Sequence, residues 1–196
     1  MTHLKILILA LSLITVFCQE SEGQDEEFLQ GMFFLSPDFG LMIGTTTRIE
    51  VSPTFGYYLN DRLCLAGGFI YEYYKQSGTY LSNYETNIYG PKVFARFTLI
   101  KNLGEFLPVQ SSIQILAHVE YESLNLENEY FSLNPTLTSG RFWYSTALIG
   151  GGFSQSTSGR FKFNALVLWD VDTSSKSPYV NPVFRVGFQY LFDFKR

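Results

Sequence analysis

The chain has 196 residues, of which 46% are hydrophobic, 17% are aromatic and only 16% are charged, and its formal net charge is −4. This length suits one domain, and the charged fraction is low for a water-soluble domain. The negative net charge argues against binding of nucleic acid through bulk charge, so no nucleic-acid partner is expected.

The N-terminus has the features of a secretory signal peptide. Lys5 supplies a positive start, and the apolar run Ile6–Phe17 is too short to span a bilayer as a helix. Small residues at Ser21 and Gly23 predict cleavage after Gly23. The expected organisation is a signal peptide (1–23), a short acidic N-terminal segment (24–31) and one further domain (32–196).

A second interpretation of the N-terminus is a lipoprotein, in which Cys18 is acylated and the acidic residues after it form a tether. The preceding Thr15-Val16-Phe17 fits poorly, because lipoprotein cleavage requires a small residue directly before the cysteine. Once residues 1–23 are removed, Cys64 has no cysteine to pair with, so we expect a small, inert filler.

The first half of the mature chain contains four segments with strand character. In most of them, large apolar residues alternate with polar or small ones, which is the pattern of a strand with two different faces. The predicted strands are residues 32–44, 46–59, 63–74 and 86–100. Pro53 and Pro91 interrupt two of them, and a β-bulge is predicted at each because proline lacks a backbone donor.

Four more strands are predicted in the second half, at residues 111–122, 141–156, 161–171 and 183–194. The last is the clearest: Phe184 and Phe188 share one face, while Arg185 and Asp193 share the other. An alternating strand of about 10 residues suits a bilayer-spanning β-barrel. In the sixth strand the pattern does not decide which face is which.

The connections support an all-β fold, an eight-stranded antiparallel up-and-down transmembrane β-barrel occupying residues 32–196. Short turns are predicted after the second, fourth and sixth strands, and longer loops after the third, fifth and seventh. Barrels of Gram-negative outer membranes have this rhythm, with tight turns and both termini in the periplasm. The first connection, Thr45–Thr47, is short for an external loop.

The two faces of these strands predict a lipid-facing outside and a charged inside. Aromatic residues gather near both strand ends, as at the two interfaces of a bilayer. They are Tyr71, Tyr73 and Trp169 at the outer rim, and Phe55, Tyr57, Phe97, Phe161, Tyr190, Phe192 and Phe194 at the periplasmic rim. The predicted lumen charge network is Arg48, Glu50, Glu72, Lys92, Arg96, His118, Glu120, Lys162, Asp170, Arg185 and Asp193. Because eight strands leave little more than room for side chains, we expect these charges to pair and close the lumen.

Several motifs resemble the small, porin-like outer-membrane β-barrel family of Bacteroidetes bacteria. They are TRIEVSPTFGYYLNDRL, GFIYEYY, NIYGPKVFARF, LIGGGF and NPVFRVGFQYLF, and together they cover nearly the whole mature chain. The resemblance implies location in the outer membrane and assembly by the outer-membrane insertion machinery, which recognises a terminal strand ending in an aromatic residue. Here Lys195 and Arg196 follow Phe194, which is a departure from that pattern.

The leading functional hypothesis is a non-enzymatic structural or interaction protein of the cell envelope, with outer-membrane lipid and another envelope protein as partners. Tyr-, Asn- and Ser-rich loops at 75–85 and 123–140 could contact such a partner. The alternative is a small ligand- or ion-conducting barrel, and the third candidate is a lipid-modifying enzyme. A soluble lipocalin-like barrel is the structural alternative.

Little in the sequence indicates catalysis or cofactor binding. His118 is the one histidine of the mature chain and is predicted to face inward, whereas a catalytic residue acting on lipid should face the bilayer. Gly150-Gly151-Gly152 is not followed by the Gly-Lys-Ser/Thr of a phosphate loop, so it is expected to mark curvature or close packing. No catalytic residues, cofactor or metal site are predicted.

Overall fold

The computed structural model describes residues 29–42, 46–76, 84–105, 113–128, 140–172 and 177–193. The predicted signal peptide, Cys18 and most of the acidic N-terminal segment lie outside the described residues, as do Phe194 and the two residues after it. The strands are β1 (Phe33–Met42), β2 (Thr46–Tyr58), β3 (Leu63–Gln76), β4 (Tyr84–Ile100), β5 (Ile113–Glu127), β6 (Arg141–Ser158), β7 (Phe161–Asp170) and β8 (Val183–Phe192). No helix in these ranges is long and apolar enough to cross a membrane.

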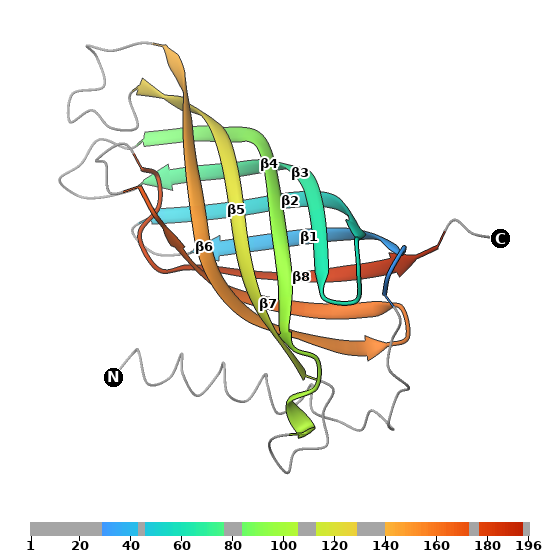
Figure 1. Ribbon diagram of the computed structural model, residues 1–196. Helices are drawn as coiled ribbons and strands as arrows, with labels where there is room; N and C mark the ends of the chain where they lie inside the picture. The colour runs from blue at the N-terminus through green and yellow to red at the C-terminus, as the bar shows by residue number, and fades with distance from the viewer. Residues whose placement is uncertain are drawn as a thin grey trace, which may run out of the picture.

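Each strand pairs antiparallel with the next, and β8 pairs with β1, so the sheet closes into a barrel in the order β1 to β8. The predicted fold is therefore confirmed. The start of β1 and the end of β8 lie at the same end of the barrel (Figure 1). We call this the turn end, because the β2–β3 and β6–β7 connections lie there. The opposite end, which carries the β3–β4, β5–β6 and β7–β8 connections, is the loop end.

Most strand ends lie within about two residues of the prediction, but one strand end and one connection differ more. Strand β5 continues to Glu127 rather than ending at residue 122, because Leu124 and Leu126 extend its buried face through a stretch that also contains Asn and Glu. After β4 the chain forms the short 3-10 helix η1 (Leu103–Glu105), where a plain four-residue turn was predicted.

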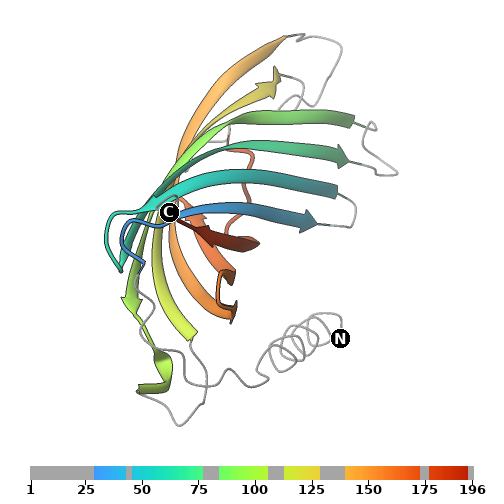
Figure 2. The ribbon, with the colours of Figure 1, turned by 90° about the vertical axis from the view of Figure 1, so that its right-hand side faces the viewer.

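The structure settles the phase of β6. Tyr144, Thr146 and Leu148 are buried, whereas Trp143 and Ile149 are exposed, so the even-numbered residues face inward. Strands β4 and β6 bend strongly along their length (Figures 1 and 2). At these bends glycine allows neighbouring backbones to approach: a Cβ on Gly90 would lie 1.8 Å from the carbonyl oxygen of Ser123. The expected role of the strand glycines in curvature agrees with this packing.

The outer wall of the barrel is apolar and the inner wall carries the ionised groups. Leu65, Val119 and Phe188 are 47%, 49% and 47% exposed, whereas Glu50 and Arg96 are 5% and 3% exposed. A soluble lipocalin-like barrel would bury the first group and expose the second, so this alternative is wrong. The apolar exterior is the arrangement that a lipid-facing barrel requires.

An aromatic belt surrounds the turn end where β7, β8, β1 and β2 meet. Phe33 lies 4.8 Å from Tyr57 and 6.3 Å from Phe192 between ring centroids, and Phe161 lies 4.8 Å from Tyr190. Near the loop end, Tyr71, Trp143 and Trp169 are exposed on the outer wall. Aromatic side chains at both rims match the two interfaces of a bilayer.

The bulges predicted at the two prolines are absent. Residues on either side of Pro53 and of Pro91 keep one register, and the register shifts lie elsewhere, at Thr98/Ile100 and Ser156/Ser158. Both prolines point outward, and the continuing register places Pro53 opposite Phe69. The Ser52 hydroxyl donates to the Phe69 carbonyl oxygen at 3.1 Å, so it supplies the hydrogen bond that the proline nitrogen cannot.

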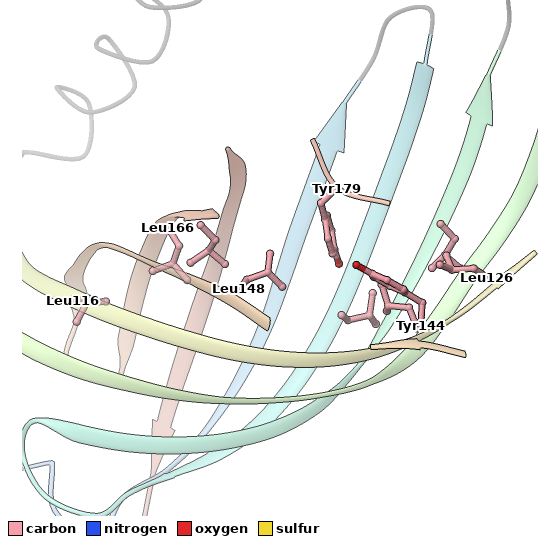
Figure 3. Close-up of a cluster of buried hydrophobic side chains, with 10 residues drawn as sticks. Leu116, Leu126, Tyr144, Leu148, Leu166 and Tyr179 are labelled. Atoms are coloured by element: carbon pink, nitrogen blue, oxygen red, sulfur yellow. The ribbon is translucent and has the colours of Figure 1, made fainter. Parts of the chain in front are cut away.

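Two apolar clusters fill parts of the interior. The larger cluster joins β3–β7 and contains Ile88, Leu126, Tyr144, Leu148 and Leu166, with Tyr179 reaching in from the β7–β8 connection (Figure 3). The cluster at the turn end contains the free Cys64, Phe34 and Leu191. Leu29 also packs there, so the chain already contributes to the barrel core before β1 begins.

Candidate functional site

The candidate site is an ionic network inside the barrel, centred on Arg185 of β8. Its guanidinium donates to Glu120 and, at 2.6 Å, to Glu122, both on β5. Its Nε lies 3.3 Å from Oε1 of Glu50 on β2. Since β8 is bonded in the sheet to β7 and β1 only, these contacts cross the lumen rather than run along the wall.

Lys92 of β4 forms a second crossing. Its Nζ lies 3.2 Å from Oδ2 of Asp38 on β1 and 3.5 Å from Oε2 of Glu120. All three side chains are almost completely buried. Glu120 therefore joins the two cations Lys92 and Arg185 into one network, which we call the lumen network and define as Asp38, Glu50, Lys92, Glu120, Glu122 and Arg185.

Tyr179 extends the lumen network toward the loop end. Its hydroxyl donates to Glu122 and accepts from Nη2 of Arg185 at 3.4 Å. Burial is the main cause that raises the pKa of the Tyr179 phenol well above its ordinary value, so the hydroxyl keeps its proton. Arg48 lies 4.8 Å from the Tyr179 ring centroid, donates to the Pro178 carbonyl at 3.1 Å and pairs with Glu72 at 2.7 Å. The β7–β8 connection is thus tied into the lumen.

Asp170 is buried, but it bonds neutral groups rather than a cation of the lumen network. It accepts hydrogen bonds from the hydroxyls of Thr146 and Ser177, and from the backbone N–H of Asp172 at 3.0 Å. The Asn181 side chain bonds its backbone on both sides, at 2.7 and 3.1 Å. Asp170 therefore positions the start of the β7–β8 connection, a role that strand alternation does not distinguish from ion pairing.

Asp193, predicted to face the lumen, is exposed, and the prediction is wrong for this residue. Strand β8 ends at Phe192, so Asp193 lies past the last paired residue, where the alternation no longer fixes a side.

Three more predicted residues lie in the half of the lumen toward the turn end. His118 accepts at Nδ1 from Nε of Arg96, at 3.4 Å, and its Nε2 lies 3.4 Å from Oε2 of Glu120. Because arginine only donates, Nε2 must carry the imidazole proton and donate to Glu120. Lys162 is buried on β7, with its Nζ 6.0 Å from the Tyr58 ring centroid.

Sequence reasoning missed Asp38, Glu122 and Tyr179. Glu122 has the same parity as His118 and Glu120, so the alternation could have found it. Asp38 shares its face with Phe34 and Ser36, but β1 is apolar enough to hide its phase. Tyr179 lies outside any strand, and no local pattern predicts that its ring enters the lumen.

The arrangement is suited to closing and stiffening the barrel. Buried charges are tolerated mainly when they are paired, and each charged group of the lumen network lies within 4 Å of an opposite charge. His118 is enclosed, so it cannot meet a lipid at the outer wall. The described residues contain no group of three or more His, Cys, Asp or Glu side chains that could hold a metal ion.

A recess of about 260 Å³ opens at the loop end above the lumen network. Arg48, Glu50 and Tyr179 line it together with residues that begin β8. Glu50, which lines the recess, is also an ion-pair partner of Arg185, so the recess borders the lumen network.

No protein-family model matches the chain, and no curated protein matches it. The N-terminal β-barrel domain of OprF from Pseudomonas aeruginosa has a similar structure, with a TM-score of 0.51 and 12% identity over 85% of this chain and all of that one. The attachment invasion locus protein Ail of Yersinia pestis gives a TM-score of 0.42 and 11% identity over 83% of this chain and 99% of that one.

The predicted resemblance therefore holds for small eight-stranded outer-membrane barrels, and nothing in these comparisons supports a family particular to Bacteroidetes. An identity of 12% speaks to the fold alone. The chain has the fold of the small eight-stranded β-barrels of Gram-negative outer membranes.

Proposed function

We propose that this chain resides in the Gram-negative outer membrane as a non-enzymatic barrel with a closed lumen, and that it acts as a structural or interaction protein of the envelope. The observation that carries the closed lumen is the crossing of Arg185 from β8 to Glu50 on β2 and to Glu120 and Glu122 on β5. Lys92 of β4 also reaches across the lumen, where it pairs with Asp38 of β1. Ion pairs that reach across the lumen in this way support a closed barrel.

The proposed orientation has the turn end and both termini in the periplasm. The tight β2–β3 and β6–β7 connections support it, because outer-membrane barrels carry short turns on the periplasmic side and larger loops outside. The loop end, with the recess and Tyr179, then faces the exterior.

The runner-up, a small ligand-binding or ion-conducting barrel, is supported by the recess at the loop end. Arg48 and Glu50 present opposite charges to it. The recess could hold a small polar molecule, but the ion pairs beneath it oppose passage. Conductance therefore separates the two proposals.

The purified barrel, reconstituted into a planar bilayer, should give no steady unitary current steps, because the ion pairs of the lumen network block the lumen. A sixteen-stranded porin in the same lipids serves as the positive control, since its lumen is water-filled. Reproducible steps of one size from the wild-type barrel would show that the lumen is open and would favour the runner-up.

An interaction role is supported by an open sheet edge at the loop end. Strands β5 and β6 rise beyond the ends of β7 and β8 (Figure 1). Pairing of β6 with β7 begins at Leu148, so the described part of β7 does not run alongside Trp143 and Ser145, which pair with β5. The Ala147 carbonyl accepts from Val171 on the β7 side. Because strand residues alternate in direction, Trp143 and Ser145 also direct their backbone N–H and C=O groups to that side.

Such an edge fits the addition of one extended strand from a partner, here another envelope protein. The exposed indole of Trp143 stands beside the free backbone groups and supplies an apolar anchor. Under the proposed orientation the edge lies outside the bilayer, where a partner chain can reach it.

Replacing Ser145 with proline removes one donor of the open edge and leaves the β5 side intact, so a bound partner should be lost. The measurement is co-purification in mild detergent, where wild type should retain a companion in stoichiometric amount. Ser145→Ala is the matched control, because it deletes the side-chain bond to Ser123 and keeps the backbone donor. A companion that survives Ser145→Pro, its absence from wild type, or a companion that is a second copy of this chain would each contradict the proposed contact.

A further inference from the structure

One layer of the lumen near the turn end contains cations and no carboxylate among its residues, whereas the lumen network combines charges of both signs. Tyr58, Cys64 and Arg96 face one another in register across β2, β3 and β4, and Lys162 pairs with Gln189 across β7 and β8. These two sets meet inside the barrel: Gln189 Nε2 donates to the Tyr58 hydroxyl at 3.0 Å. We call this set of residues, with Asn164 beside Lys162, the basic layer.

Both cations of the basic layer lie near Cys64: Arg96 pairs with it in register, and Lys162 Nζ lies 6.0 Å from the ring centroid of Tyr58, which pairs with Cys64 on its other side. The carboxylates of the lumen network lie toward the loop end. The layer is linked to them by His118, which stands between Arg96 and Glu120. Among the described residues Arg96 forms no ion pair with a carboxylate, although it is 3% exposed.

Polar atoms in this layer lack partners in the described part of the chain. Nη1 and Nη2 of Arg96 have no acceptor, and neither amide atom of Asn164, which is 2% exposed, has a hydrogen-bond partner. The Oε1 of Gln189 is also unbonded. Buried donors without acceptors are costly, so native proteins bring in water or an ion to satisfy them.

The positive charge of the Arg96 guanidinium favours an ion over water as the missing partner. A guanidinium that is buried with two unused donors favours an anion, because hydrogen bonds from a charged donor to an ionised acceptor are about twice as strong as neutral ones. Phe94 covers one side of Arg96, with its ring centroid 5.0 Å from Cζ, and His118 takes its Nε. The two terminal nitrogens are therefore the part of Arg96 left to bind a ligand, with the Asn164 amide as a further donor.

We propose that the basic layer binds one small inorganic anion of the halide class at Nη1 and Nη2 of Arg96, with Lys162 adding its charge. Enclosure within an eight-stranded wall limits the ligand to about the size of chloride. The anion neutralises part of the charge of the basic layer, as the carboxylates do for Lys92 and Arg185 in the lumen network. The site is independent of any role in contacting partners.

The first test measures thermodynamic stability against halide concentration. The reconstituted barrel is unfolded with urea in sodium chloride or sodium bromide, with ionic strength held constant by sodium gluconate, whose anion is too large for the layer. Above the dissociation constant, each tenfold rise in halide should raise the folding equilibrium constant about tenfold. Arg96→Gln should abolish this dependence, whereas Lys75→Gln, which removes an exposed ion pair with Glu85, should keep it.

The second test needs no variant and remains decisive if Arg96→Gln fails to fold. Crystals of the wild-type barrel grown with sodium bromide should show an anomalous peak at the terminal nitrogens of Arg96. Water alone in the basic layer would overturn the proposal, as would a halide dependence that Arg96→Gln leaves unchanged. A bromide peak without any halide-dependent stabilisation would mean binding at crystal concentration only and would also overturn it.

Discussion

Replacing Arg185 with leucine should destabilise the barrel by about 3–5 kcal/mol, because removal of one partner leaves buried charge without compensation. Glu120, Glu122 and Glu50 all contact this guanidinium. The loss should shrink at acid pH, since a protonated carboxyl no longer needs a counter-charge. The measurement is reversible urea unfolding in lipid vesicles, followed by the fluorescence of Trp143 and Trp169.

The matched control is Arg160→Leu, which removes an arginine that is exposed in the β6–β7 turn and should change stability by less than about 0.5 kcal/mol. Adding Glu122→Gln to Arg185→Leu should recover part of the lost stability, because it removes one of the stranded charges. If Arg185→Leu unfolds within about 1 kcal/mol of wild type, the lumen network does not hold the barrel together.

Replacing Gly152 with alanine should cost about 3 kcal/mol, although the change adds only one methyl group. A Cβ at this position would lie 1.9 Å from the Ala165 carbonyl oxygen and 2.8 Å from the Leu166 Cα. Both atoms belong to the backbone of β7, which cannot move aside without breaking its pairing with β6. The measurement is the same urea unfolding, together with the yield of folded barrel after refolding.

Gly67→Ala provides the control, since a Cβ there would meet its nearest atoms at 3.9 Å, on the outer wall. This variant should be as stable as wild type. Equal stability of Gly152→Ala and Gly67→Ala would show that the close approach of β6 and β7 is not required.

The fold could be predicted because polar inward-facing residues and apolar outward-facing residues alternate along each strand of such a barrel. Alternation with a period of two separates Phe188 from Gln189 and Val119 from Glu120, and it needs no knowledge of distant residues. The phase of β6 could not be predicted, because Gly150, Gly151 and Gly152 interrupt the pattern at its centre. The error at Pro53 has another cause: the hydroxyl of Ser52 replaces the missing donor, so no extra residue is needed.

The candidate site was predictable only as a set of inward positions. Strand parity indicates that Arg185 and Glu120 face inward, but they are 65 positions apart in sequence, and their pairing depends on side-chain reach across the closed barrel. For the same reason the sequence did not separate Asp170, which holds the β7–β8 connection, from the carboxylates that pair with cations. Tyr179 could not be assigned, because nothing local directs a residue of an irregular connection into the interior.

The contribution of Arg185 from the final strand bears on how the protein is assembled. Until β8 arrives, an incomplete sheet holds Glu50 of β2 and Glu120 and Glu122 of β5 without the guanidinium that contacts all three. Pairing of β8 with β1 therefore has two effects. It satisfies the backbone N–H and C=O groups of the open sheet edge, and it brings Arg185 to the carboxylates of β2 and β5. We therefore expect a nascent barrel that lacks β8 to be destabilised by uncompensated buried charge as well as by its unpaired sheet edges.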